Sequence, residues 1–288
     1  MLYLGVVNEE RKLTRVSELN NEVYSEYALH LAKVNRFEND LSLYMTVELN
    51  YQEIHSTIQK YSEQYKKNSQ MSWILIRRII LDINRRVLNY LSTFRTYLDH
   101  AEYLLKKEYG KDSEQVKKFK EVCSKEYDNY FAYRFLYKLR NYSQHCGMPV
   151  GNVSLGQRAN DDNGIDYSLI VTFDRDELLR SYDSWGNPVK GELEKLPLSI
   201  VVNGYLEELQ ECIKRIQSCL MEFRIDELKK SVDYIRNLIN PLEKYKGTPC
   251  IMDFSEMKQN DGNINLRWFP MHIIQMFDDI LNSKMEFN

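Results

Sequence analysis

The chain has 288 residues, a formal net charge of −3 and a sequence pI of about 6.0, so no global basic field marks it as a nucleic-acid binder. Its five cysteines form no Cys-x-x-Cys pair, which argues against a disulfide framework or a zinc site. No apolar stretch approaches the roughly 20 residues of a membrane helix. The first residues also lack the basic leader of a secretory signal. We therefore expect a cytoplasmic protein that needs no cofactor and no metal.

The first half of the chain favours long helices, because most glycines and all prolines lie in the second half. Residues 20–67 are expected to be mostly helical, with a break near Asn39-Asp40, where Asp40 could cap a second helix. The strongest helix runs from Met71 to about Glu108. Its apolar residues recur at spacings of three and four from Ile76 to Leu105, which is typical of a bundle seam.

A further helix is expected to begin near Ser113, a good N-cap, and to run without interruption to about Cys146. Gly110 would end the helix before it, and Gly147 with Pro149 would end this one. Two long helices joined by a short glycine-containing loop predict an antiparallel hairpin.

The second half changes character, with shorter segments and more turn residues. We expect a β-hairpin at Val150–Leu155 with Tyr167–Phe173 and a loop at Ser181–Pro197. Two helices are expected at Leu198–Phe223 and Asp226–Tyr245. A second β-hairpin, around Asp261-Gly262, is expected at Pro249–Phe254 with Asn263–Phe269, and a last helix at Met271–Leu281. The predicted fold class is therefore mainly α: a helical bundle built on a long antiparallel helix hairpin, with small β-hairpin insertions in the second half. The expected segments are a helical bundle over 1–147, a β-containing insertion over 148–197, and C-terminal helices with a short hairpin over 198–288.

The most informative motif lies in the last two turns of the helix ending near Cys146. There Arg140, Asn141 and His145 combine a permanent cation, an amide and an imidazole, which are groups that metal-free cleavage of a phosphodiester would use. An Arg followed five positions later by a His occurs three times, at Arg95–His100, Arg140–His145 and Arg267–His272. Only the Arg140 copy has Asn after the Arg. Pro270 interrupts the third copy, and Arg95 is spaced for an ordinary ion pair with Asp99.

The run Leu139-Arg140-Asn141-Tyr142-Ser143-Gln144-His145 resembles the signature of the HEPN superfamily. The resemblance covers the hairpin from about Met71 to Cys146. It implies an all-helical, homodimeric protein, and many members are metal-independent endoribonucleases of toxin–antitoxin, anti-phage and other defence systems. RNA, a second copy of the chain, and an antitoxin or another defence protein would then be the partners. Other members bind RNA or proteins without catalysis, which is the alternative function.

If RNA binds at this motif, His145 could take the proton of a ribose 2′-hydroxyl or deliver one to the leaving 5′-oxygen. Arg140 would hold the scissile phosphate and Asn141 would orient His145 or a phosphate oxygen. The resemblance implies products with a 2′,3′-cyclic phosphate and a 5′-hydroxyl. A well-known subgroup carries a Tyr two residues after the His as a target for nucleotidylation. Gly147 stands at that position here, so that control is not supported.

Four neighbouring residues are candidates for RNA binding: Tyr133, Tyr137, Lys138 and Gln144. Tyr127 and Tyr142 fall on the apolar face and are expected in the core. The segment from Lys106 to Arg140 contains ten Lys or Arg and six Asp or Glu. This surplus of basic residues is either a solvated helix face or a strip that attracts phosphate. The motif also has a purely structural alternative, in which its cation and imidazole favour the negative end of the helix dipole.

Overall fold

The computed structural model describes residues 1–68, 70–159, 165–255 and 264–282. Its contacts divide the chain into two units: unit 1 is Met1–Leu41 with Met221–Asn288, and unit 2 is Ser42–Leu220. These boundaries differ from the expected divisions after residues 147 and 197. The prediction of a mainly α protein with small antiparallel sheets is confirmed. Among the helices of the described ranges, none combines the length and the apolarity needed to cross a bilayer.

The first helix, α1, spans Asn21–Lys67 and contributes to both units. The expected break near Asn39-Asp40 is wrong, because α1 continues through these residues. Asp40 does not cap a helix. Its carboxylate instead forms an ion pair with Arg224 of unit 1, so the side chain has a tertiary partner.

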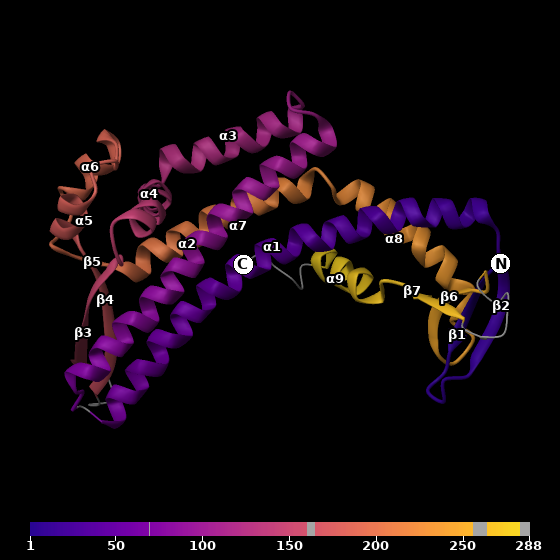
Figure 1. The fold of residues 1–288 in the computed structure, drawn as a ribbon, viewed down its shortest axis with the longest axis horizontal. Helices are drawn as coiled ribbons and strands as arrows, with labels where there is room; N and C mark the ends of the chain where they lie inside the picture. Colours follow the sequence, from indigo (N-terminus) through magenta and orange to yellow (C-terminus); the bar gives the residue numbers. More distant parts are fainter. Residues whose placement is uncertain (69, 160–164, 256–263, 283–288) are drawn as a thin grey trace. The chain divides into compact units, whose positions relative to one another are not determined.

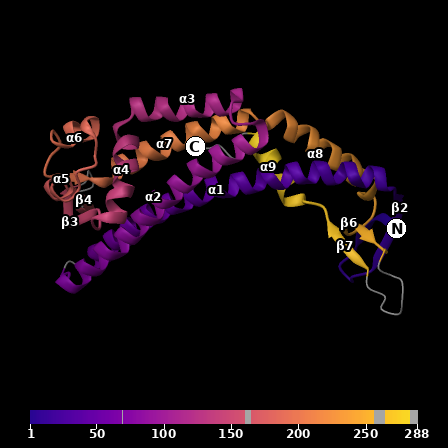
Figure 2. The same cartoon turned by 45° about the horizontal axis from the view of Figure 1, so that its top comes forward.

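The hairpin that carries the motif begins with α2, Trp73–Tyr109. Its buried side chains include Ile83, Val87, Tyr90 and Phe94, as the apolar seam predicts. Gly110 ends α2 with a φ of 92°, and its N–H donates to the carbonyl of Lys106, a conformation that favours glycine. The hydroxyl of Ser113 then accepts from the N–H of Val116 and starts α3, Glu114–Asn129. Figures 1 and 2 both show α3 running back along α2.

The expectation of one helix from Ser113 to Cys146 is wrong. The helix ends at Asn129, Tyr130 is extended with φ −117° and ψ 114°, and α4 begins afresh as Phe131–His145. The motif therefore lies on a short helix of its own. This helix packs against α2 and runs in a direction different from that of α3 (Figure 1).

After α4, unit 2 continues with a small sheet and further helices. Strands β3 (Val150–Ala159), β4 (Ile165–Asp174) and β5 (Ser199–Val201) form an antiparallel sheet in that order, which confirms the first hairpin. The segment expected to be a loop instead contains α6, Asn187–Leu193, and α5, Arg175–Ser181, precedes it. Asp174 caps α5 through the N–H of Glu177, and a proline in the first turn starts α6. The last helix of this unit is α7, Val202–Glu222.

Unit 1 joins the two ends of the chain in one antiparallel sheet of order β2-β1-β6-β7. Its elements are β1 (Leu2–Val7), β2 (Leu13–Leu19), α8 (Ile225–Ile239), the 3₁₀ turn η1 (Asn240–Leu242), β6 (Thr248–Asp253), β7 (Asn265–Trp268) and α9 (Met271–Leu281). The second hairpin and the last helix are confirmed. Its Asp261-Gly262 turn lies outside the described residues. Strands β1 and β2 were not predicted from the sequence.

The chain after the motif is fastened to α2 by one buried amide. Asn84 Nδ2 donates to the carbonyl of Val150 at 3.0 Å, and Asn84 Oδ1 accepts from the N–H of Val150 at 2.9 Å. The side chain thus pairs with the backbone as a neighbouring strand would. It fixes the start of β3, and with it the end of α4, against α2.

Replacing Asn84 by Ala should lower the free energy of unfolding by about 2–4 kcal/mol, because it leaves the buried N–H and carbonyl of Val150 unpaired. Urea unfolding followed by circular dichroism measures the change. Asn89→Ala, at an exposed position of the same helix, is the matched control and should stay within about 0.5 kcal/mol of the parent. Equal losses in the two variants would contradict the role given to Asn84.

Candidate functional site

The break at Tyr130 is held by side chains that satisfy the helix ends on both sides. Arg134 Nη1 donates to the carbonyls of Tyr127 and Asp128, both at 2.6 Å, which lie in the last turn of α3. On the other side, the N–H of Ala132 in the first turn of α4 donates to Glu208 of α7 at 3.2 Å. Helix ends leave such groups without partners inside the helix. Because Arg134 and Glu208 supply hydrogen-bond partners to these groups, two separate helices are stabilised in place of one continuous helix.

An ion pair between the buried Glu126 and the partly exposed Arg215 fixes the same corner to α7. Arg215 holds Glu126 through two nitrogens, with Nη2 at 2.7 Å from Oε2 and Nε at 3.0 Å from Oε1. Only 4% of the Glu126 side chain is exposed, so its charge depends on this partner. The hydrogen bond from Arg215 and its proximity to the carboxylate raise the pKa of the guanidinium. The same guanidinium lies over the ring of Tyr130 at 4.4 Å, so one side chain contacts α3 and the residue at the break.

Four residues of α4 follow one another at a spacing of four: Tyr133, Tyr137, Asn141 and His145. Residues four apart on a helix are neighbours on its surface. They form a stripe, here called the α4 stripe, that begins in the interior and ends at the exposed His145. The motif residues Asn141 and His145 are thus the outer half of a longer polar and aromatic row.

The three motif residues lie close in sequence but differ in their surroundings. Arg140 is half-buried, and its Nη1 makes a long hydrogen bond of 3.4 Å to Asn141 Oδ1. Its Nε is shielded from solvent without a hydrogen-bond partner. His145 is exposed, and among the described residues no hydrogen bond joins it to Arg140 or Asn141. The structural alternative, in which His145 bonds carbonyls of the last turn, also finds no such bond among the described contacts.

The end of the α4 stripe is firmly placed. Tyr142, one of the expected core residues, is buried and stacks on Trp185 with ring centroids 6.0 Å apart. A Cβ on Gly147 would lie 3.3 Å from the Tyr142 hydroxyl, which leaves little room for a larger residue there. Of the other candidates, Gln144 is exposed and Lys138 is half-buried.

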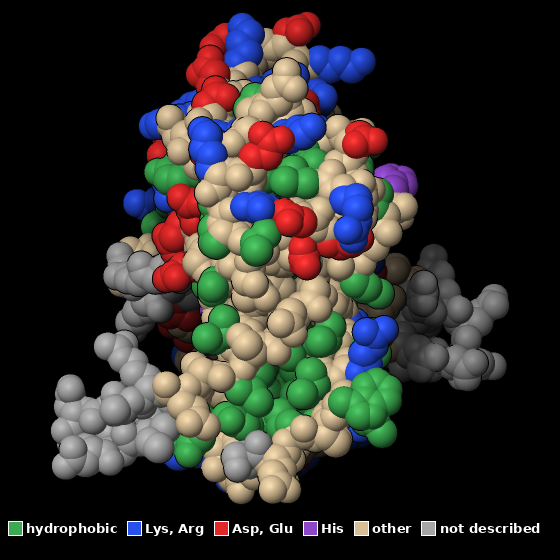
Figure 3. Space-filling model, turned by 90° about the vertical axis from the view of Figure 1, so that its left-hand side faces the viewer, with side chains coloured by type: hydrophobic (Ala, Val, Ile, Leu, Met, Phe, Trp, Pro, Cys, Tyr) green, Lys and Arg blue, Asp and Glu red, His purple; other side chains and the backbone are tan. Residues whose placement is uncertain are grey.

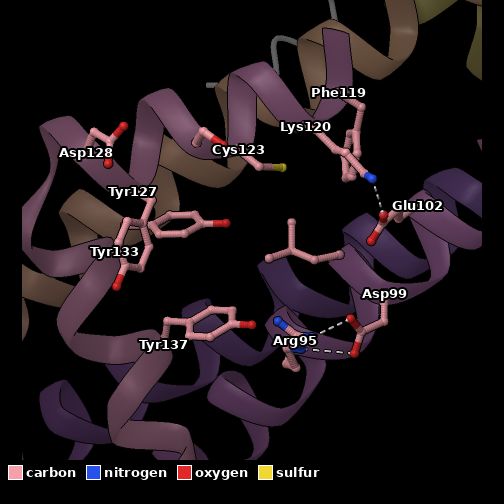
Figure 4. A pocket seen from close by; sticks show the side chains of 12 residues that line it. Arg95, Asp99, Glu102, Phe119, Lys120, Cys123, Tyr127, Asp128, Tyr133 and Tyr137 are labelled. Carbon is pink, nitrogen blue, oxygen red and sulfur yellow. Dashed lines mark hydrogen bonds and ion pairs between the residues drawn. The ribbon is translucent and has the colours of Figure 1, made fainter. Parts of the chain in front are cut away.

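A pocket of about 530 Å³, which the sequence did not predict, is lined by α2, α3 and the first half of α4. Figure 4 shows Tyr133 and Tyr137 facing Arg95 and Asp99 of α2 across the hollow. Arg95 binds both carboxylate oxygens of Asp99, at 3.0 and 2.8 Å, and its guanidinium lies 4.7 Å from the centre of the Tyr137 ring. The expected Arg95–Asp99 ion pair is confirmed, and it forms part of the pocket wall.

The position of Tyr133 does not agree with the expectation that it contacts RNA. It is only 3% exposed, because it packs edge-on against Phe94 and parallel to Tyr137 at 6.5 Å, so its ring face is not free to stack on a base. Burial raises its pKa. Tyr137 is half-buried and reaches the pocket.

The remaining pocket wall is rich in carboxylates. Glu102 accepts from Lys106 at 2.7 Å and lies 3.4 Å from Lys120, and these hydrogen bonds lower the pKa of its carboxyl group. Asp128 lies exposed at the rim, and its carboxylate has no ion-pair partner among the described residues. Burial raises the pKa of the Cys123 thiol to about 12, so this thiol is protonated at neutral pH.

None of the three motif residues lines this pocket, which instead adjoins them along the α4 stripe. The contact of Arg95 with Tyr137 and that of Asn84 with Val150 set α4 antiparallel to α2. His145 therefore lies on the Asn84 side of Arg95, and His100 lies beyond Arg95 in the other direction. Within the described ranges, no three His, Cys, Asp or Glu side chains converge as metal ligands would.

Comparison with family models, with curated proteins and with solved structures finds no match to this chain.

Replacing Arg215 by Ala should lower the free energy of unfolding by about 3 kcal/mol, because Glu126 would remain as a buried charge without its partner. Guanidinium unfolding measures the loss. Glu126→Gln in the same protein should restore part of it, since the unpaired charge is then gone. The control is Arg180→Ala, which removes an ion pair with Glu177 in which the Arg180 side chain is 75% exposed. This variant should change the free energy of unfolding by less than about 1 kcal/mol. An Arg215→Ala protein as stable as this control would show that the corner does not depend on the pair.

Proposed function

We propose that the chain is a metal-independent endoribonuclease that uses Arg140, Asn141 and His145. The observation that carries the proposal is the exposed imidazole of His145, which ends the α4 stripe one turn after Asn141 and has no partner among the described residues. A proton-transfer group must reach its substrate from an open position, and an imidazole changes charge near neutral pH. The guanidinium of Arg140 lies beside Asn141 and supplies the cation that a phosphodiester needs.

The proposed reaction is an internal transesterification of RNA. The ribose 2′-oxygen attacks the adjacent phosphorus as its proton passes to an imidazole. The bond from phosphorus to the 5′-oxygen breaks, and the leaving oxygen takes a proton from an imidazolium. Arg140 stabilises the charge that grows on the phosphate oxygens, and Asn141 positions a phosphate oxygen. The products are a 2′,3′-cyclic phosphate and a 5′-hydroxyl.

A homodimer would complete this site. Arg140 and His145 are five residues apart, so their side chains leave the helix about 140° from one another. A second copy of α4 could bring its Arg140 toward the His145 of the first. A base and an acid would then also be present as two imidazoles, one from each copy.

Purified protein in EDTA should cut labelled single-stranded RNA, and His145→Ala should slow the cleavage by about 10²–10⁴-fold because proton transfer is lost. Arg140→Ala should slow it by about 10²–10³-fold because charge stabilisation is lost. Gel analysis measures the rates, and end labelling before and after phosphatase treatment identifies the ends. His100→Ala removes the other exposed imidazole of this hairpin and should leave the rate unchanged. Cleavage that both motif variants retain would reject catalysis at this site.

A second candidate function is a module that binds a protein partner without catalysis. It is favoured by the surface of unit 2 near the α1–α2 turn, where hydrophobic side chains gather on the lower part of the face in Figure 3. Trp73 and Ile74 at the start of α2 are 74% and 66% exposed, and large exposed apolar groups of this kind mark interaction sites. This function predicts full biological activity in His145→Ala protein and a loss in Trp73→Ser protein.

A further inference from the structure

The end of the α1–α2 hairpin carries apolar side chains that the core does not cover. The hydroxyl of Ser72 caps α2 and fixes its start, and the first turn is then apolar throughout, from Trp73 to Ile76. Four consecutive residues point in all directions around a helix, whereas the core lies on one side of it. Trp73 and Ile74 are therefore left 74% and 66% exposed, and Leu81, about two turns later, is 52% exposed.

Basic residues surround this apolar end. From Lys60 to Arg78 the sequence holds five Lys or Arg and one Asp or Glu, although the whole chain has a net charge of −3. Arg77 and Arg78 lie one turn after the exposed apolar pair, and Lys66 and Lys67 end α1. All four are exposed and have no ion-pair partner among the described residues. On the face in Figure 3, acidic side chains gather in the upper part, away from the apolar patch below.

These residues form one surface with two properties, apolar side chains and positive charge that no carboxylate balances. It is here called the hairpin-end surface, and its members are Lys66, Lys67, Trp73, Ile74, Arg77, Arg78 and Leu81.

The surface of an anionic bilayer matches both properties. Its phosphate head groups attract Lys and Arg, and its boundary with the acyl chains takes up Trp and aliphatic side chains. Single-stranded RNA offers phosphates as well, but Ile74 and Leu81 have no ring on which a base could stack. A protein interface fits less well, because Lys is depleted at such interfaces. Binding of this kind needs no helix that crosses the bilayer.

We propose that the hairpin-end surface binds the surface of an anionic lipid bilayer, with Trp73 and Ile74 at the head-group boundary and the four basic side chains at lipid phosphates. The inference is independent of the proposed nuclease, since none of these residues belongs to the motif on α4. It gives the surface an occupant other than the protein partner of the second candidate function.

Co-sedimentation of the full-length protein with phosphatidylcholine vesicles, with and without phosphatidylserine, tests the proposal. The protein should bind the mixed vesicles at least about 10-fold more tightly, because phosphatidylserine supplies the negative surface. Added salt should weaken this binding.

Two double variants remove the two properties separately. Trp73→Ser with Ile74→Ser should weaken binding to the mixed vesicles by at least about 10-fold, through the loss of apolar burial. Arg77→Gln with Arg78→Gln should weaken it by about 10–30-fold, since each cation near an anionic surface contributes about 5-fold.

Matched double variants outside the hairpin-end surface are the controls. Leu29→Ser with Leu49→Ser changes two other exposed apolar residues of α1, and Lys229→Gln with Lys230→Gln changes two adjacent exposed cations of α8. Both should bind the mixed vesicles as the parent does. If the serine variant of the hairpin end does not fold, as judged by circular dichroism, the arginine variant decides alone, since both of its side chains are exposed.

Weaker vesicle binding in both hairpin-end variants, but in neither control, supports the proposal. Equal binding of the two kinds of vesicle, or binding that neither hairpin-end variant weakens, would overturn it. Absence of any vesicle binding would also overturn it and would leave the surface to a protein partner, or to RNA if the affinity for labelled RNA falls in the same variants. Cleavage of RNA is measured without vesicles and should be the same in the hairpin-end variants and the parent, so failure here does not touch catalysis by His145.

Discussion

The site depends on one constraint, the end of α3 at Asn129 and the fresh start of α4 at Phe131. A single continuous helix would carry the Tyr133–Tyr137 row away from α2, and the pocket between the three helices would not exist. The change of direction leaves backbone groups at two helix ends without partners inside the helix, and Arg134 and Glu208 supply those partners. The ion pair of the buried Glu126 with Arg215 then ties the corner to α7. These side chains position the α4 stripe, although none of them belongs to the motif.

Local patterns predicted the hairpin well because its signals are local. The seam of α2, the positive φ of Gly110 and the cap at Ser113 each depend on residues within one or two turns. The end of α3 could not be predicted in this way. Its apolar spacing continues from Phe119 to Tyr142 without a fault, and Glu126 and Arg215 are 89 residues apart in the sequence. Helix periodicity therefore indicated which residues face inward but not that the axis turns between them.

The same limit explains what was missed at the site. The Arg140, Asn141 and His145 cluster could be found because three functional groups lie within six residues. The pocket draws on three helices, and its Arg95–Asp99 pair resembles any surface ion pair until Tyr137 is placed beside it. On one long helix, Tyr133 lies off the apolar face, which made it a candidate for RNA binding. It is buried because Phe94 and Tyr127 pack around it where α3 and α4 meet.

The sheet of unit 1 has a consequence for the newly made chain. Strand β1 pairs with β6, so Val6 meets Pro249 only after more than two hundred intervening residues have been synthesised. At ~5–20 residues per second the ribosome needs ~12–50 s for that stretch. Unit 2 is continuous in sequence and can fold during this interval. Strand β1 meanwhile has β2 on one side and an open edge on the other, the kind of edge that other chains can pair with. Until β6 is synthesised, the free edge of β1 is therefore the part of this sheet most open to pairing with other chains.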